Sequence, residues 1–480
     1  MKLRRRFHVF YRRHKVKTYQ AVTEAVLQEL REITGAAHVK TAPHILQSYS
    51  EDESGMLAHR QAEVVVFPGT AEEISRIMKL ANRRRIPVTP RGAGTGVCGG
   101  VVPVYGGIVV SMERLNRILE VRENGLYLVA EAGVRTADIQ AAARAKGLLY
   151  AGDPCSSDSC FIGGNLATNA GGNKAVRYGT TRQQVYAVEA VLPTGEITQF
   201  GSVLKKCSTG FCLEQLLIGS EGILGIITKV ILKLVPLPPY RFDGLIIFSS
   251  LEQAVSLVPK LMQSAVNPTS VEFMDKKFVR RAVQYCRVPL PHWQDAYYVI
   301  VTLEAFCSEE LARMTETLVA LGETCGAVDM VKADERVWKV RRNCLESTRA
   351  LSRESTSEDL VVPLLQIGNC LHTLMKKAAT YSFEAFCLAH AGDGNLHFQL
   401  LRGDLPAAVW QAEVADFRKF AYPFVYRSGG RLSGEHGIGC KRVAYMEAYT
   451  DPVELAVMKK IKNALDPHGI LNPGKVLREE

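Results

Sequence analysis

The chain has 480 residues, of which 47% are hydrophobic and 22% charged, and its formal net charge is +10. This length is too great for one hydrophobic core, so we expect two or more globular domains. No apolar run approaches the roughly 18–20 residues that cross a bilayer, so we expect no transmembrane segment. Only +2 of the charge lies outside the first 20 residues, which gives no indication of nucleic-acid binding.

The N-terminal arm, residues 1–20, carries eight Lys and Arg side chains and no acidic one. Such a run is typical of a solvated tail, of a contact for an acidic partner or a lipid surface, or of a targeting segment. It lacks the apolar core of a secretory signal. The twelve cysteines contain no CxxC pair. This spacing argues against an iron–sulfur or zinc-ribbon module and suggests a reducing compartment.

The first elements after the arm belong to a helical segment, 21–59, and then to an alternation of strands and helices. Apolar residues recur at helical spacing in the early part of this segment. A strand is predicted at Val64–Phe67 and a second at Ile86–Thr89. Between them, Thr70 is a plausible N-cap with Glu73 three residues later, which predicts a helix start.

A glycine loop follows the second strand. Gly94, Gly96 and Gly99 satisfy GxGxxG, the dinucleotide fingerprint, which requires a helix to begin there. The following residues, VVPVYGGIVVSM, are typical of a strand instead. We therefore reject the Rossmann interpretation. The loop could still hold a pyrophosphate through the backbone N–H groups of Arg91–Gly96.

Two further stretches are rich in glycine: 151–179, AGDPCSSDSCFIGGNLATNAGGNKAVRYG, and the GSEGILG segment that begins at Gly219. A backbone almost bare of bulky side chains allows a large flat cofactor to lie against it. Strands and short helices alternate around these loops. The pattern indicates an α+β fold rather than a doubly wound sheet.

The PLPPY segment, Pro236–Tyr240, marks a boundary in the chain. Beyond it we predict a strand, a helix capped by Ser250, further strands, and a helix at Glu309–Thr324. This spacing suggests a second α+β domain that sits as a cap over the cofactor.

The segment FCLAHAGDGNLHFQL is the sharpest local signal for chemistry. Its two apolar runs flank a Gly392–Asp393–Gly394 turn, so a hairpin would set His390 and His397 nearly opposite each other and on one face. Such a pair either shares a metal or is structural. Further along, RLSGEHGIG places Glu435 and His436 in a glycine-rich turn.

A carboxylate with two imidazoles makes an open site for a divalent metal. Zinc, manganese, ferrous iron or cobalt would suit it and keep positions for substrate. Adjacent side chains diverge, so His436 cannot easily bind the same ion as Glu435. It is then free to act as a base.

PRGAGTG, GGNLATNAGG, RYG and GSEGILGIIT resemble, in order and spacing, the FAD-binding domain of vanillyl-alcohol-oxidase-type flavoproteins. HAGDGNLH, SGEHGIG and LDPHGILNPGK are similar to the FAD-linked D-2-hydroxyacid dehydrogenase branch of that family. This branch includes D-lactate dehydrogenases, the glycolate oxidase flavin subunit and D-2-hydroxyglutarate dehydrogenases. The resemblance implies an α+β fold with a two-subdomain FAD domain, an α+β cap and a C-terminal helical segment.

The resemblance also implies roles for individual residues. His390, His397 and Glu435 would hold one divalent metal, His436 would be the catalytic base and would contact substrate, and Asn472 would lie near the flavin. FAD, expected to be non-covalent, would be bound by the following residues: Pro90, Arg91, Gly92, Ala93, Gly94, Thr95, Gly96, Pro154, Ser156, Cys160, Gly163, Gly164, Asn165, Thr168, Asn169, Gly171, Gly172, Tyr178, Gly179, Glu221, Gly222, Gly225, Ile227 and Asn472.

Arg341 matches the carboxylate-binding arginine of the family, although a solvated helix arginine is the alternative. Gln399 matches a position where an amide contacts substrate. Family members that act on dicarboxylates carry a lysine where this chain has Ser357 in SEDLVVP. The absence of that cation favours a small monocarboxylate, D-lactate first, over 2-hydroxyglutarate.

The expected activity is therefore FAD- and metal-dependent oxidation of a D-2-hydroxyacid to the 2-oxoacid. Alternatives are a glycolate or D-2-hydroxyglutarate dehydrogenase, another alcohol oxidase, or a vestigial flavin subunit of a larger complex. Electrons would pass to an external acceptor, such as an electron-transfer flavoprotein, an iron–sulfur subunit, a quinone or cytochrome c. We expect a cytoplasmic or membrane-peripheral protein, mitochondrial in a eukaryote. The expected domains are the arm 1–20, the helical segment 21–59, the FAD domain 60–237, the cap 238–440 and the C-terminal segment 441–480.

Overall fold

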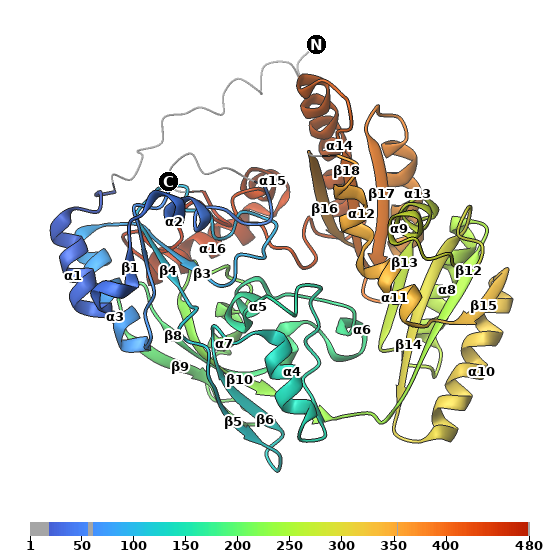
Figure 1. Cartoon of the computed structure of the whole chain (residues 1–480), viewed down its shortest axis with the longest axis horizontal. Coiled ribbons are helices and arrows are strands. Elements are labelled where there is room, and N and C mark those ends of the chain that lie inside the picture. The colour runs from blue at the N-terminus through green and yellow to red at the C-terminus, as the bar shows by residue number, and fades with distance from the viewer. Residues whose placement is uncertain (1–18, 56–60, 353, 479–480) are drawn as a thin grey trace.

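The computed structural model describes residues 19–55, 61–352 and 354–478. The basic arm, except for its last two residues, lies outside the described residues. The described chain is built on three large sheets (Figure 1). Two of them belong to the half that carries the glycine loops, and the third belongs to the cap.

The first sheet has the order β1-β2-β4-β3, in which β2, β4 and β3 run parallel. The hydroxyl of Thr70 accepts from the N–H of Glu73, so the predicted cap is present. Segment 21–59 also supplies β1, which joins this sheet, so it is not purely helical. The elements are α1 (Glu24–Thr34), η1 (Ala36–His38), β1 (Val39–Lys40), α2 (Pro43–Ser48), β2 (Val64–Val66), α3 (Ala71–Arg84), β3 (Val88–Arg91) and β4 (Ile108–Ser111).

The second sheet is antiparallel, in the order β5-β6-β10-β8-β9. The GxGxxG loop leads to β4 and not to a helix, as expected. The elements are β5 (Ile118–Arg122), β6 (Tyr127–Glu131), α4 (Thr136–Arg144), α5 (Ile162–Thr168), α6 (Ala175–Tyr178), η2 (Thr181–Gln184), β8 (Val185–Val191), β9 (Ile197–Gly201), α7 (Leu213–Leu217) and β10 (Ile226–Lys233). A small ribbon pairs β7 (Leu148–Leu149) with β11 (Val235–Pro236).

The cap is one seven-stranded antiparallel sheet, in the order β15-β12-β14-β13-β17-β18-β16. Its strands are β12 (Tyr240–Phe248), β13 (Ser270–Met274), β14 (Tyr297–Ala305), β15 (Asp329–Lys332), β16 (Ser355–Val361), β17 (Glu384–His390) and β18 (Asn395–Leu401). One face packs against α8 (Leu251–Gln263), α10 (Ser308–Thr324), α13 (Ile367–Ala378) and α14 (Ala407–Arg427). The other packs against α9 (Lys276–Cys286), α11 (Glu335–Arg342) and α12 (Cys344–Arg349). The short helix η3 (Leu364–Gln366) precedes α13.

The C-terminal segment returns to the glycine-loop half. After α15 (Val443–Tyr449) and α16 (Pro452–Leu465), the chain runs beside β3. The N–H of Asn472 donates to the carbonyl of Val88 over 2.7 Å. This return brings the LNPGK segment beside the loop that follows β3.

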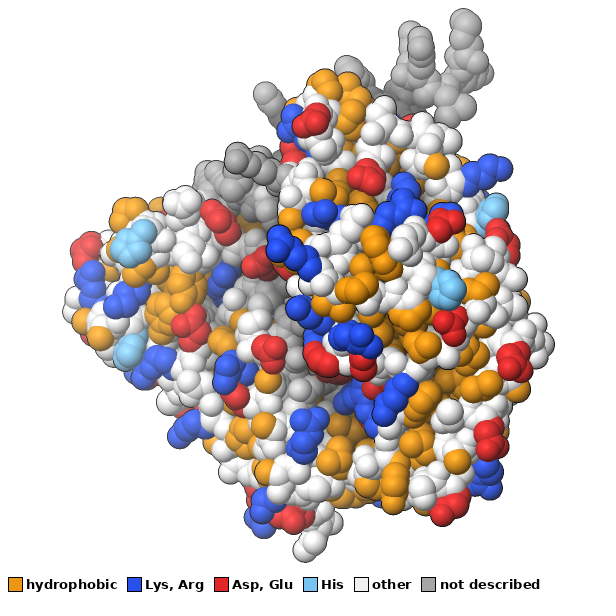
Figure 2. Space-filling model, turned by 45° about the vertical axis from the view of Figure 1, so that its right-hand side comes forward, with side chains coloured by type: hydrophobic (Ala, Val, Ile, Leu, Met, Phe, Trp, Pro, Cys, Tyr) orange, Lys and Arg blue, Asp and Glu red, His pale blue; other side chains and the backbone are white. Residues whose placement is uncertain are grey.

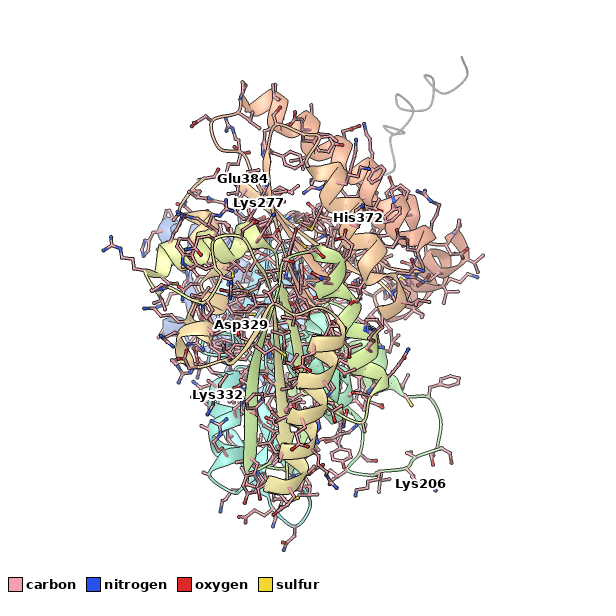
Figure 3. All side chains as sticks on the ribbon, turned by 90° about the vertical axis from the view of Figure 1, so that its right-hand side faces the viewer. Lys206, Lys277, Asp329, Lys332, His372 and Glu384 are labelled. Carbon is pink, nitrogen blue, oxygen red and sulfur yellow. The ribbon has the colours of Figure 1, made fainter. Side chains whose placement is uncertain are left out.

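Two features of the surface are plain in the figures. Charged side chains of both signs lie around the hollow between the two halves (Figure 2). The loop between β9 and α7 projects from the body, with Lys206 on its outer side (Figure 3). No helix in the described part of the chain is long and apolar enough to cross a membrane.

Candidate functional site

A cavity of about 1140 Å³ lies between the glycine loops and the cap. It exceeds the roughly 300–1,000 Å³ of pockets that take drug-sized ligands. Its walls combine the loop after β3, the 153–174 stretch and the GSEG turn with side chains of the cap. The predicted cofactor residues that line it are Pro90, Arg91, Gly92, Ala93, Gly94, Thr95, Gly96, Pro154, Ser156, Cys160, Gly163, Gly164, Asn165, Thr168, Glu221, Gly222, Gly225 and Ile227.

The glycines of this cavity leave room for a large flat group. A Cβ added at Gly164 would meet no atom within 4 Å, and one added at Gly92 would lie 3.7 Å from the Cα of Gly164. Gly163 is required for close packing, since its Cβ would fall 2.7 Å from that of Ala132. Two backbones thus approach each other and face open space. The residues present fit an extended dinucleotide such as FAD.

Six predicted cofactor residues do not line the cavity, and the structure gives them supporting contacts instead. They are Asn169, Gly171, Gly172, Tyr178, Gly179 and Asn472. A Cβ at Gly171 would lie 2.6 Å from Oε2 of Glu435. The amide nitrogen of Asn472 donates to the carbonyl of Glu221 over 2.8 Å. These residues hold the walls against one another.

The β17–β18 hairpin brings the two predicted histidines together. His397 pairs with Leu388, two residues before His390, so the histidines are diagonal neighbours on one face. Their ring centroids are 5.2 Å apart. The sequence had suggested a nearly opposite pair; the register places Asn395 opposite His390 because the turn spans four residues.

Glu435 completes a set of three ligand atoms. Its Oε1 lies 3.5 Å from Nε2 of His390 and 3.4 Å from Nε2 of His397. These atoms all lie within 4.8 Å of one another. The Nε2 atom of His397 is buried and has no hydrogen-bond partner among the described residues. An orphaned imidazole nitrogen facing a carboxylate fits a divalent metal ligand set.

Glu272, which the sequence reading did not single out, stands behind His390. It is fully buried, and its Oε1 lies 2.7 Å from Nδ1 of His390. Its Oε2 accepts from Nε and Nη2 of Arg341, at 3.1 and 2.5 Å. The Nε–Nη2 edge of the Arg341 guanidinium is therefore occupied by Glu272. The remaining nitrogen, Nη1, takes part in neither of these hydrogen bonds, and Arg341 lines the cavity.

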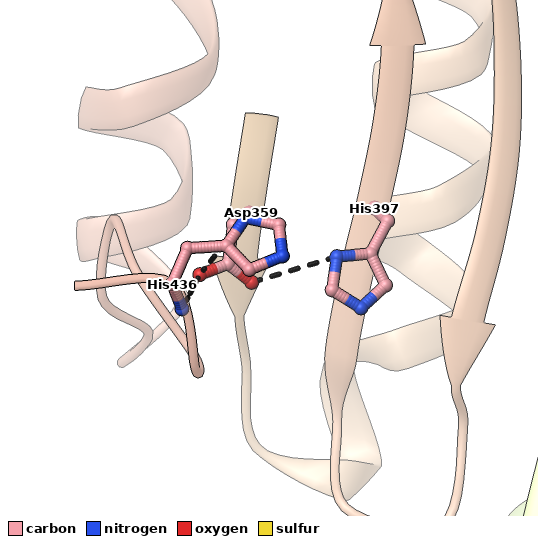
Figure 4. Close-up of side chains that lie close together, drawn as sticks. All are labelled: Asp359, His397 and His436. Atoms are coloured by element: carbon pink, nitrogen blue, oxygen red, sulfur yellow. Dashed lines mark hydrogen bonds and ion pairs between the residues drawn. The ribbon is translucent and has the colours of Figure 1, made fainter. Parts of the chain in front are cut away.

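Asp359 is a second buried carboxylate that organises the site (Figure 4). Its Oδ2 accepts from the backbone N–H groups of Gly434, Glu435 and His436 at 2.8–3.1 Å, and from the hydroxyl of Ser433 at 2.7 Å. Its Oδ1 accepts from the amide of Asn395 and lies 3.6 Å from Nδ1 of His397. One carboxylate thus fixes the Glu435–His436 turn and faces a histidine of the ligand set.

Asp359, His397 and His436 also lie close enough to be a second metal ligand group. We favour the first group. The oxygen of Asp359 nearest His436 already accepts four hydrogen bonds, so its lone pairs are engaged. The rings of His397 and His436 are stacked, with centroids 5.1 Å apart. Asp359 is therefore better described as a hydrogen-bond acceptor behind the site.

The charges of the site are strongly coupled. Burial opposes ionisation of Glu435, but His390 and then His397 outweigh it and lower its pKa to about 2. Burial likewise opposes protonation of His390, yet Glu272 and Glu435 raise the pKa of His390 well above its usual value. Burial lowers the pKa of His397 to about 4. Without a metal, the two carboxylates thus favour the protonated form of His390, and a bound cation would compete with that proton.

Gln399 and Ser357 face each other across the β16–β18 pair. The hydroxyl of Ser357 donates to Oε1 of Gln399. Both side chains line the cavity, beside His397. The oxygen end of the amide is therefore held by the sheet, and its N–H₂ end remains for the cavity.

Sequence reasoning missed Glu272 and Asp359 as parts of the site. Glu272 lies in SVEFMD, where it reads as one polar residue in an apolar strand. A buried acidic residue in a central strand needs cationic partners, and that was the available signal. For Asp359 the signal was only the DLVVP segment noted beside Ser357.

Two known protein families match most of the chain. The family described as FAD binding domain matches residues 62–201, and the family described as FAD linked oxidases, C-terminal domain, matches residues 237–476. A D-lactate dehydrogenase of Anaerostipes hadrus is 34% identical, covering 95% of this chain and 98% of that protein. The glycolate oxidase subunit GlcD of Bacillus subtilis is 32% identical, covering 96% and 98%.

A third relative and one solved structure are also similar to this chain. A D-2-hydroxyglutarate dehydrogenase of Stutzerimonas stutzeri is 30% identical, covering 94% of this chain and 98% of that protein. Among solved structures, p-cresol methylhydroxylase with substrate bound matches with a TM-score of 0.79 at 14% identity, covering 95% of this chain and 97% of that one. The expected α+β fold is confirmed by this likeness and by the two family matches.

Proposed function

We propose that this chain, which belongs to the FAD-linked oxidases and is an FAD-dependent D-2-hydroxyacid dehydrogenase, acts on D-lactate. In this proposal it oxidises D-lactate to pyruvate with the help of one divalent metal. The observation that carries the proposal is the shared cavity. His390, His397 and Glu435 converge at the cap side, with His436 beside them, and the glycine loops form the opposite wall.

Each group has a distinct task in this proposal. A bound FAD would accept the hydride of the substrate. A divalent metal held by His390, His397 and Glu435 would polarise the substrate hydroxyl. The free guanidinium edge of Arg341 would bind the carboxylate, and the N–H₂ end of Gln399 would donate to a substrate oxygen.

His436 would take the hydroxyl proton at Nε2. Its Nδ1 is buried and faces the carboxylate of Asp359, whose Oδ2 lies 3.8 Å away, too far for a hydrogen bond. In the proposed role a proton on Nδ1, toward this negative charge, would leave the acceptor lone pair on Nε2, which lies 3.9 Å from Oε1 of Glu435. Proton removal would therefore occur beside the metal ligands.

The decisive experiment is anaerobic titration of the flavin spectrum with a panel of D- and L-hydroxyacids, before and after chelation. We expect D-lactate to bleach the flavin band faster than L-lactate, glycolate or 2-hydroxyglutarate, and chelation to abolish the bleaching. Faster bleaching by glycolate or 2-hydroxyglutarate would replace D-lactate by that substrate. A flavin that none of them reduces would sink the proposal.

His436→Ala isolates the base. The variant should keep FAD, because the imidazole of His436 does not belong to the glycine loops. Reduction of the flavin by substrate should slow by roughly 10²-fold or more. Stopped-flow absorbance measures this rate. Reduction at the wild-type rate would show that the base assignment is wrong.

Ser357→Lys tests the substrate size. A lysine at this position would add a cation beside Gln399 and should move the preference from D-lactate toward 2-hydroxyglutarate by roughly tenfold or more in kcat/KM. Ser357→Ala is the control, since it removes the same hydroxyl without adding charge. Equal preferences in the two variants would rule out a role for charge here.

We also propose that electrons leave to an external acceptor, an electron-transfer flavoprotein or an iron–sulfur subunit, with a cytoplasmic or membrane-peripheral location. The twelve cysteines support this, because their spacing offers no cluster motif within the chain. Reoxidation of the substrate-reduced protein by candidate acceptors would test it.

A further inference from the structure

The loop between β9 and α7 is the most exposed segment of the described body. Every residue from Gly201, which ends β9, to Leu213, which begins α7, is exposed, and loop 202–213 here includes that first residue of α7. Among them are four large apolar side chains, with the following exposed fractions: Val203 37%, Leu204 58%, Phe211 92% and Leu213 40%. Figure 3 shows this loop standing away from the sheets. Apolar side chains gathered on one exposed segment mark a contact with something outside the chain.

The loop is not held by the body of the protein. The backbone hydrogen bonds that the structure gives for residues 202–213 are local: the N–H groups of Leu204, Leu213 and Gln215 donate to the carbonyls of Ser202, Phe211 and Cys212. A Cβ added at Gly210 would meet no atom within 4 Å. The apolar side chains of the loop can therefore insert into another apolar environment without losing contacts with the hydrophobic core.

The charge of the loop narrows the choice of partner. Residues 202–213 contain Lys205 and Lys206 and no acidic residue. The two lysines lie between Leu204 and Phe211 in the chain. Apolar side chains flanking adjacent basic ones are the composition that binds the interface of an anionic bilayer.

We propose that loop 202–213 docks the protein on an anionic lipid bilayer. Leu204 and Phe211 enter the headgroup–acyl boundary, and Lys205 and Lys206 contact lipid phosphates. The loop leads directly into α7, whose last residue, Leu217, lines the cofactor cavity. Docking would therefore hold the cavity-bearing half against the membrane. The inference is independent of which hydroxyacid is the substrate.

Vesicle sedimentation with the full chain tests this surface. Wild type should sediment with vesicles of phosphatidylcholine and phosphatidylglycerol, and less with phosphatidylcholine alone. K205E/K206E should weaken binding to the mixed vesicles by about tenfold or more, since each lysine near an anionic surface contributes substantially. Phe211→Ser should weaken it by about tenfold, because a fully inserted aromatic ring is lost.

Matched variants keep the test specific. Leu365→Ser removes an 84% exposed apolar side chain from the cap, and K277E/K332E reverses two exposed lysines there (Figure 3). Both should bind vesicles like wild type. The proposal is overturned if wild type does not bind, or if the loop variants bind as well as wild type, which would assign binding to the basic arm. It is also overturned if Phe211→Ser changes only the oligomeric state in light scattering, which would make a second copy the occupant.

Discussion

At the scale of single residues, Asp359 fixes the geometry of the site more than any of the proposed metal-binding side chains does. It is fully buried, and burial alone would raise its pKa, but His436, His397 and Arg442 hold that pKa well below its usual range. The ionised carboxylate can therefore accept from every donor that faces it. Because those donors include the N–H groups of Glu435 and His436, its charge fixes the proposed metal ligand and the proposed base together.

Asp359→Asn should separate this role from folding. An amide keeps one oxygen for the 433–436 turn but turns its N–H₂ group toward Asn395 and His397, where donors would face each other. Outer partners of metal ligands typically contribute about 10–100-fold in metal affinity or activity. We expect losses of that size in both metal content and kcat, with FAD absorbance retained.

The control for this variant is Asp404→Asn, an exposed aspartate in the turn after β18. It should leave both quantities at the wild-type level. Metal content is read by mass spectrometry and kcat by flavin reduction. Wild-type metal affinity and kcat in Asp359→Asn would contradict the role we assign to this carboxylate.

Residue-scale prediction from sequence succeeded where partners are close in the chain. His390 and His397 lie on one hairpin, so the turn residues between them were enough to predict a shared face. Glu272 and Asp359 could not be assigned in this way, because their partners lie 69–118 and 36–77 residues away. Only the tertiary fold brings such groups together.

At the scale of elements, local chemistry decided what was predictable. β-branched residues after GxGxxG were sufficient to exclude a Rossmann helix, and the Thr70 and Ser250 caps fixed two helix starts. The role of segment 21–59 was only partly predicted, because β1 has two residues and exists through its pairing with β2. A strand of two residues is too short to show the alternation of apolar and polar side chains that predicts a strand.

Helix α9 offers a test of how the cap is fastened. Asp275 caps this helix: its Oδ1 accepts from the N–H of Phe278. Its Oδ2 accepts from the N–H of Cys387 in β17, and each donor–acceptor distance is 2.6 Å. Asp275→Asn leaves one oxygen, so a buried N–H loses its acceptor. The free energy of unfolding should fall by about 1–3 kcal/mol.

The N-cap of α16 provides the matched control. Asp451 accepts from Val453 and Glu454 through the same oxygen, Oδ1. Asp451→Asn can keep that oxygen in place and should cost only a few tenths of a kcal/mol. Urea denaturation of both variants gives the comparison; equal losses would show that the bond to β17 contributes nothing.

At the scale of the whole molecule, the proposed cofactor and metal sites belong to different halves. The glycine loops come from the first two sheets, whereas His390 and His397 lie on the cap sheet and Glu435 on the turn that follows α14. That turn is fastened to both halves. Asp359 holds it from the cap, and Glu221 of the GSEG turn accepts from the N–H groups of Ile438 and Gly439 at 2.6 and 2.7 Å. The turn is thus fixed without the metal.

Removal of the metal should therefore leave the architecture and the flavin in place. We expect chelator-treated protein to keep its FAD absorbance and to unfold at nearly the same temperature, while D-lactate no longer bleaches it. Each divalent ion added back should restore bleaching to a different degree, because the N/N/O ligand set accepts several metals. Gel filtration with absorbance detection follows the flavin, and an anaerobic titration follows the bleaching. Loss of FAD on chelation would show that the two halves depend on the metal for their contact, and that the hydrogen bonds of Glu221 and Asp359 are not sufficient to hold the turn.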